Sequence, residues 1–173
     1  MAGLDGHTRT YRLSTSVRVA KFTALIGDPT QTGTTTGAIY AAVPTAANQG
    51  PVKGVTLEHW LEPNTFYMED TDPSTITGTT PSSPYQNFLG GTTGQDNGPT
   101  VQYTGQARAY AAGVVKDGDI VVIADAYGRV NNATNLSIAA GTTLYPVGIA
   151  RTSSAQINDV IFVDLNFAPV PNP

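Results

Sequence analysis

The chain has 173 residues, no cysteine and a formal net charge of −4, and 40% of its residues are hydrophobic. This length and composition suit one domain with a buried core, and they exclude a disulfide scaffold, a thiolate zinc site and a cysteine nucleophile. Nine basic residues against thirteen acidic ones, without a basic run, argue against a nucleic-acid partner.

We expect neither a membrane span nor a secretion signal. No run of about 18 apolar residues is present, so we expect no membrane span and no membrane partner. The N-terminal residues carry charge where a signal peptide has its apolar stretch. We therefore expect synthesis in a cytoplasm without export by the usual route.

The remaining composition predicts an all-β protein. Gly (18 residues), Pro (12 residues) and Thr are abundant, whereas Lys and Glu are scarce. Thr and Val favour pleated surfaces, and Gly and Pro favour turns. The fold expected is a small β-barrel or sandwich with an extended N-terminal arm and long irregular loops. Its weakly charged surface suits a protein that is packed against other copies or a larger partner.

In chain order, residues 1–14 are predicted to form the polar arm, which leads into a strand. Apolar and polar residues alternate over Tyr11–Leu25, with a register change near Lys21 and Phe22. Residues 27–38 form a Thr/Gly-rich loop, and residues 52–57 form a short strand.

The segment 15–100 is predicted to be β-rich with long loops that pack on the barrel or on partners. Residues 57–62 are compatible with a single helical turn. Residues 63–100 are interrupted by many Pro and Gly residues. Because a structureless loop of this length is uncommon inside a compact domain, we expect it to pack on something. Its expected anchors are aromatic and apolar: Tyr67, Tyr85, Phe88 and Leu89.

The segment 101–173 is predicted to be a small β-barrel followed by a Pro-rich tail. Short strands alternate with turn signals at spacings of about ten residues, which is typical of small barrels and sandwiches. The predicted strands are 101–112, 120–124, 129–130, 146–150 and 159–165.

Residues for catalysis or metal binding are few. His59 lies beside Trp60 and between Glu58 and Glu62, so it could be a general base or a metal ligand, or a partly buried histidine next to an aromatic anchor. The acidic run 69–72 could bind Ca²⁺ but lacks the glycine and distal glutamate of a calcium loop, so a solvated turn is the simpler interpretation. We expect no enzyme activity, no cofactor and no metal site.

Aromatic residues are the better candidates for function. Tyr and Trp suit both cores and interfaces, because each combines an apolar body with a polar tip. Five aromatic candidates lie in the irregular half of the chain, and the arm adds two further side chains. The candidate interface residues are Tyr11, Arg12, Tyr40, Trp60, Tyr67, Tyr85 and Phe88.

The stretch from about Gly105 to Phe167 resembles the small β-barrel of tailed-bacteriophage capsid decoration (cement) proteins. In that family a strand follows a Gly-Asp turn, and a Val-Gly-Ile-Ala strand and a Val-rich strand complete the barrel. The matching residues here are Ala112–Gly113, Asp117–Val122, Gly128–Val130, Gly141–Ala150 and Asp159–Val163.

This resemblance implies a structural virion protein on the outer surface of a phage capsid. Such proteins bridge neighbouring major capsid subunits, stabilise the mature head and commonly form homotrimers. The expected partners are therefore the major capsid protein and further copies of this chain. In this view the arm and the loop 63–100 contact the capsid or neighbouring copies, and the barrel is the rigid body.

Two other classes of function stay open at this point. A head-fibre, tail or carbohydrate-binding β-module would present an exposed aromatic platform, for which Trp60 and Tyr67 are the candidates. A hydrolase would need His59 and a carboxylate to converge in a pocket.

Overall fold

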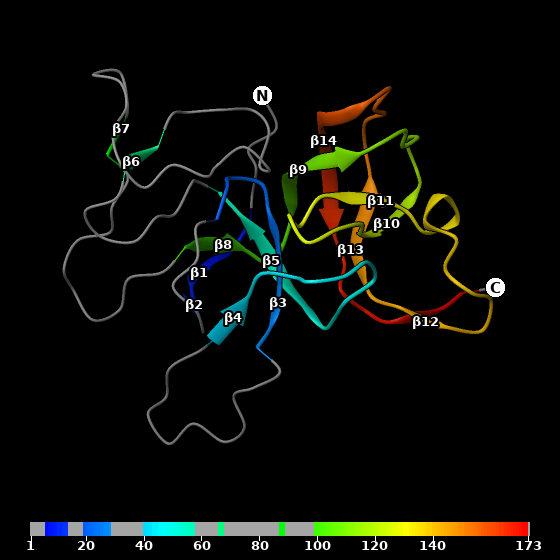
Figure 1. Cartoon of the computed structure of the whole chain (residues 1–173), viewed down its shortest axis with the longest axis horizontal. Helices are drawn as coiled ribbons and strands as arrows, with labels where there is room; N and C mark the ends of the chain where they lie inside the picture. The colour runs from blue at the N-terminus through cyan, green and yellow to red at the C-terminus, as the bar shows by residue number, and fades with distance from the viewer. Residues whose placement is uncertain are drawn as a thin grey trace.

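The computed structural model describes residues 6–13, 19–28, 40–57, 66–67, 87–88 and 99–172. Within these ranges the protein consists of β-strands and a short 3-10 helix, so the all-β prediction is confirmed. A closed barrel and a six-stranded sheet form the body of the molecule (Figure 1).

The barrel has five strands, all of them between residues 106 and 165. Neighbouring strands are antiparallel except for one parallel pair, β11 with β9. A five-stranded barrel encloses little space, and small side chains at alternate positions of β9 face it. In order around the barrel, the strands are β10 (Ile120–Ile123), β11 (Val130–Asn132), β9 (Gln106–Ala112), β14 (Ile157–Leu165) and β13 (Pro146–Ala150).

A single stretch of chain supplies both end strands of the six-stranded sheet. Its two end strands, β1 and β2, are separated in sequence only by Tyr11. Tyr11 is 5% exposed and packs with Val19, Leu25 and Val101. In sheet order the strands are β1 (Thr8–Thr10), β8 (Thr100–Gln102), β5 (Val52–Thr56), β3 (Ala24–Gly27), β4 (Tyr40–Ala42) and β2 (Arg12–Leu13).

Strand β3 joins the sheet to the barrel because both of its faces are buried. Ala24 and Ile26 belong to the same hydrophobic cluster as Ile123 and Val130 of the barrel. Leu25 points the other way, into the cluster that contains Tyr11. Alternate residues of a strand face opposite sides, so three consecutive apolar residues serve two cores. One face of the sheet therefore shares its core with the barrel, and the other face has a core of its own.

Polar groups reinforce this junction. The backbone N–H of Ala24 donates to the carbonyl of Gly128, at 3.0 Å. Asn48 adopts a left-handed conformation (φ 52°) and its N–H donates to the carbonyl of Ile123. The Asn48 side chain accepts from the N–H of Tyr145 and donates to the carbonyl of Thr143, both at 2.9 Å.

A third cluster covers the outer face of β10. Val122 packs there with Ala133 and Leu144. The chain end is held by Asn172, whose side chain donates to the carbonyls of Ile138 and Ala139. The covering elements are η2 (Ala133–Leu136), β12 (Thr143–Leu144) and β15 (Val170–Pro171); separately, β6 (Phe66–Tyr67) pairs with β7 (Asn87–Phe88).

Most predicted strands of the C-terminal half are confirmed, with one correction. The predicted strand 101–112 is wrong, because it divides at Gly105 (φ 76°) into β8 and β9, which belong to different sheets. Near the register change predicted in Tyr11–Leu25, Lys21 and Phe22 form a turn, and β3 begins after it at Ala24. The strands predicted at 52–57, 120–124, 146–150 and 159–165 correspond to β5, β10, β13 and β14.

Within the segment expected as an arm, residues 8–13 are strands of the six-stranded sheet. Their pairing with β8 and β4 explains this, since it satisfies backbone groups that a free arm would leave to water. The predicted helical turn at 57–62 lies outside the described residues beyond Leu57.

Gly128 tests whether the sheet–barrel junction stabilises the fold. A Cβ at Gly128 (φ 70°) would lie 2.5 Å from Cγ2 of Thr23 and 2.6 Å from the carbonyl oxygen of Ala24. Gly118 (φ 88°) has the same left-handed backbone, but a Cβ there meets nothing within 4 Å. We expect Gly118→Ala to cost about 1–2 kcal/mol from the backbone alone, and Gly128→Ala to cost clearly more.

Urea denaturation of both variants measures this difference. Equal losses for Gly128→Ala and Gly118→Ala would contradict a close-packed junction.

Candidate functional site

The longest ladder of the barrel, β9 with β14, presents a mixed aromatic and cationic outer face. Ala107 and Ala109 are buried in the barrel, so the alternation of the strand directs Arg108 and Tyr110 outward. On β14, Phe162 lies opposite Arg108 and Val160 lies opposite Tyr110. We call Phe22, Arg108, Tyr110, Val160 and Phe162 the ladder face.

Phe22 reaches this face from the turn before β3. Its ring centre lies 5.6 Å from that of Tyr110, at an interplanar angle of 54°. Tyr110 is thereby 2% exposed although it is on the outside of the barrel. The backbone of Phe22 is in the left-handed region (φ 61°), which is rare for a bulky residue and costs about 1–3 kcal/mol. The surrounding structure must hold this conformation in place.

Thr56 of β5 holds the turn with a set of buried hydrogen bonds. Its side chain is fully buried; Oγ1 donates to the carbonyl of Ala20 at 2.7 Å and accepts from the N–H of Thr23 at 2.9 Å. Its backbone carbonyl accepts from the N–H of Phe22 at 2.8 Å, and its N–H donates to the carbonyl of Thr23. These hydrogen bonds hold the residues on both sides of Phe22. Thr56 of β5, and not the turn itself, therefore keeps Phe22 in its left-handed backbone conformation.

Cations gather around the Phe22 ring. Nζ of Lys21 lies 5.8 Å and Cζ of Arg108 lies 5.9 Å from its centre. The Arg108 carbon also lies 5.5 Å from the centre of the Phe162 ring. Such distances are within the range of cation–π attraction. Arg108 itself is exposed, so its charge is positioned by rings but remains open to solvent.

The ladder face includes an exposed apolar side chain, and further exposed apolar side chains lie beyond its end. Val160 is 45% exposed, and Ile157, earlier on the same strand, is 50% exposed. Tyr127 is 45% exposed, and Cζ of Arg129 lies 5.2 Å from its ring centre. Arg129 also donates to Oδ1 of Asn158 at 2.9 Å, which places Tyr127 near the start of β14. Several exposed apolar side chains along one strand and at its start are more typical of an interaction site than single exposed residues are.

The other end of the ladder is polar. Nε of Arg151 donates to Oδ2 of Asp164 at 2.5 Å, and Gln106 donates to Oδ1 at 3.2 Å. The hydrogen bond from Arg151 holds the pKa of Asp164 below its ordinary value of 3.8. The backbone N–H groups of Ala155 and Gln156 lower the pKa of Asp159 in the same way. Both carboxyl groups are therefore ionised at neutral pH.

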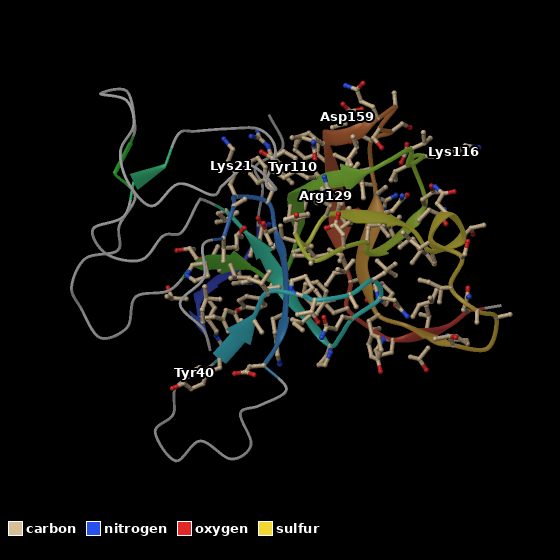
Figure 2. The ribbon with its side chains drawn as sticks, in the orientation of Figure 1. Lys21, Tyr40, Tyr110, Lys116, Arg129 and Asp159 are labelled. Carbon is tan, nitrogen blue, oxygen red and sulfur yellow. The ribbon has the colours of Figure 1, made fainter. Side chains whose placement is uncertain are left out.

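Figure 2 shows how these parts lie in space. Lys21 and Tyr110 lie near the junction of the sheet and the barrel on the upper side of this view, and Arg129, Asp159 and Lys116 lie further to the right, on the barrel. Tyr40 lies at the lower end of the sheet, far from them.

Of the predicted interface residues, the side chains of Tyr11 and Tyr40 are described. Tyr11 is a core residue of the six-stranded sheet. Arg12 and Tyr40 are partners in the parallel register of β2 and β4, and Tyr40 is half-buried there. Tyr67 and Phe88 lie on the paired strands β6 and β7, of which only the backbone is described. Trp60 and Tyr85 lie outside the described residues.

The residues considered for catalysis or metal binding lie mostly outside the part that the structure describes. His59, its neighbours Glu58 and Glu62, and the acidic run 69–72 all lie outside the described residues. His7 hydrogen-bonds to Thr104 through both its backbone N–H and its ring. In the part of the chain that the structure describes, no three His, Asp or Glu side chains gather as metal ligands, and no helix is long and apolar enough to cross a membrane.

Sequence reasoning missed the ladder face. A signal was present in Gln106–Ala112, where small apolar residues alternate with Arg108 and Tyr110. The position of Phe22 had no such signal, because a tertiary contact with β5 sets it. Compared with known proteins, the sequence matches no protein-family model and no curated protein.

Replacing Thr56 tests how the Phe22 turn is held. Thr56→Val preserves the shape but leaves the N–H of Thr23 and the carbonyl of Ala20 without this hydroxyl, so we expect a loss of about 2 kcal/mol or more in unfolding free energy. Thr56→Ser retains the hydroxyl and should lose clearly less. Chemical denaturation measures both, and equal losses would show that methyl packing, not hydrogen bonding, holds the turn.

Asp164 should contribute to the acid sensitivity of the fold. Because its folded-state pKa lies below its ordinary value, its stabilising effect is present above about pH 3.8 and is lost as the pH falls through the folded-state pKa. Asp164→Asn should therefore lose less stability than the wild type between pH 7 and pH 3. Denaturation midpoints at the two pH values measure this.

The partner of Asp164 provides the control for that experiment. In a protein that already carries Arg151→Gln, Asp164→Asn should change the acid sensitivity less than it does in the wild type. A wild-type pH response in both Asp164→Asn proteins would exclude this pair as a source of acid sensitivity.

Proposed function

We propose that this protein is a structural component of a phage head, which binds the outer surface of the capsid and stabilises the shell by bridging major capsid subunits. The observation that carries the proposal is that residues 105–167, the stretch that resembles capsid decoration proteins, contain all five strands of a closed barrel. A closed barrel leaves few free strand edges. It is therefore a suitable rigid body for a protein present at high local density.

The shared core supports the same proposal. Through Ala24 and Ile26 the barrel and the six-stranded sheet pack as one unit. A rigid unit with binding surfaces on two parts can contact two neighbouring subunits at once. Many weak contacts of this kind around a lattice add up through avidity.

The ladder face is the surface that we assign to docking. It combines aromatic and arginine side chains with exposed aliphatic ones, which is the composition of protein interfaces. The weakly charged composition of the chain, with 13% charged residues, is compatible with a large part of the surface being covered.

Copy number in virions tests this proposal. Particles of the phage that encodes the chain are purified, and the chain is quantified by mass spectrometry against the major capsid protein. We expect a simple lattice fraction, on the order of one copy per capsid subunit or per few subunits. A few copies per particle would indicate a fibre or tail component, and absence from particles would contradict a structural role in the virion.

A further inference from the structure

Arg108 differs from the other arginines of the barrel region in lacking a carboxylate partner. Arg129 forms an ion pair with Asp125 at 2.6 Å, and Arg151 forms one with Asp164. Among the described residues, Arg108 has no ion pair and no side-chain hydrogen bond, and its recorded contacts are with the Phe22 and Phe162 rings. Its guanidinium N–H donors are therefore available to a ligand.

The two rings also restrict where this guanidinium lies. Phe162 is the register partner of Arg108 on β14, and Phe22 is fixed by Thr56 in a strained backbone conformation. An arginine loses considerable side-chain entropy when it is immobilised by a ligand. Contacts with two fixed rings reduce that loss, because the guanidinium is already placed.

The chemistry of this arrangement selects a class of ligand. A guanidinium presents a planar fork of N–H donors that matches the two oxygens of a carboxylate. Carboxylates and phosphates both fit the fork, but the surroundings favour a protein. Val160, opposite Tyr110, is 45% exposed, and the exposed Ile157 and Tyr127 lie further along the ladder towards the start of β14; these side chains suit an apolar protein surface. A nucleic acid would require a larger positive footprint than this acidic chain offers.

We propose that Arg108 is the anchor of the ladder face and receives an Asp or Glu carboxylate of the protein on which the chain docks. The inference rests on the proposed function, in which that protein is the major capsid subunit, and it specifies the chemistry of the contact. Phe22 and Phe162 are positioning residues for the guanidinium. Val160, two residues before Phe162 on the same face of β14, helps to exclude water from the pair and so strengthens it.

Binding to heads tests the anchor. Heads assembled without this protein are mixed with the full chain, and bound protein is measured after sedimentation at increasing concentrations. We expect Arg108→Gln to weaken binding at least tenfold, as truncation of a buried charged partner does. Lys116→Gln removes the same charge from the turn after β9, away from Lys21 and Tyr110 in Figure 2, and should change binding less than twofold.

A conservative variant separates the guanidinium fork from simple charge. Arg108→Lys keeps the charge but loses the paired donors, so we expect it to bind heads nearly as weakly as Arg108→Gln. Full binding by Arg108→Lys, or equal losses in Arg108→Gln and Lys116→Gln, would overturn the proposal in favour of general electrostatic attraction. Circular dichroism and denaturation of each variant exclude misfolding as the cause of a loss.

A measurement without heads distinguishes failure of the anchor from failure of the proposed function. Hexaglutamate is titrated into the ¹⁵N-labelled full chain while the arginine Nε signals are observed. We expect the Arg108 signal to shift saturably and the paired Arg151 signal to stay in place. A uniform shift of all arginines, or a stronger response to inorganic phosphate than to hexaglutamate, would overturn the carboxylate assignment.

The head-binding assay and the hexaglutamate titration together show whether the Arg108 anchor or the capsid-binding proposal is wrong. Shifts at Arg108 with a wild-type chain that does not bind heads would support the carboxylate site and contradict the capsid as its partner. Head binding that is unaffected by Arg108→Gln would support the proposed function and overturn the anchor.

Discussion

The architecture depends on one strand that is buried on both sides. Ala24 and Ile26 of β3 complete the core of the barrel, and Leu25 between them completes the core of the six-stranded sheet. A strand with two buried faces cannot shift register by one residue without exchanging the residues of both cores. The sheet and the barrel are therefore fixed relative to each other by apolar packing. The hydrogen bond from the N–H of Ala24 to the carbonyl of Gly128 follows from the close approach that this packing requires.

The ladder face is a consequence of that junction. The residues just before β3 must turn over the outside of the barrel, and Thr56 of the adjacent strand β5 holds them there. Phe22 is thereby laid across Tyr110 and beside Arg108. A surface that combines residues from the sheet and the barrel exists only while the two parts keep this arrangement, so the stability of the junction and the geometry of the docking surface are linked.

The distribution of arginine partners divides the barrel surface into two kinds of site. Arg129 and Arg151 have carboxylates of the same chain at hydrogen-bond distance, and exposed pairs such as Arg151 with Asp164 contribute little to stability. Arg108 is stabilised by rings, which occupy the faces of the guanidinium and leave its donors available. Of the three arginines of the barrel region, Arg129 and Arg151 form ion pairs within the chain, whereas the guanidinium of Arg108 is open to a partner.

The sequence by itself determined the all-β class and most barrel strands, because alternation, β-branched residues and Gly turns are local signals. Strands such as β13 and β14 could be predicted from their own residues. The burial of Tyr11 and the position of Phe22 depend on contacts between residues far apart in the sequence. Tyr11 was predicted to be an interface residue, but the stretch 8–13 supplies both end strands of the sheet and Tyr11 is buried between them. Phe22 acquires its role from Thr56, 34 positions later, and from a barrel strand that follows later still. Local preference selects strands, whereas the pairing of distant strands decides which side chains are buried and which are presented together.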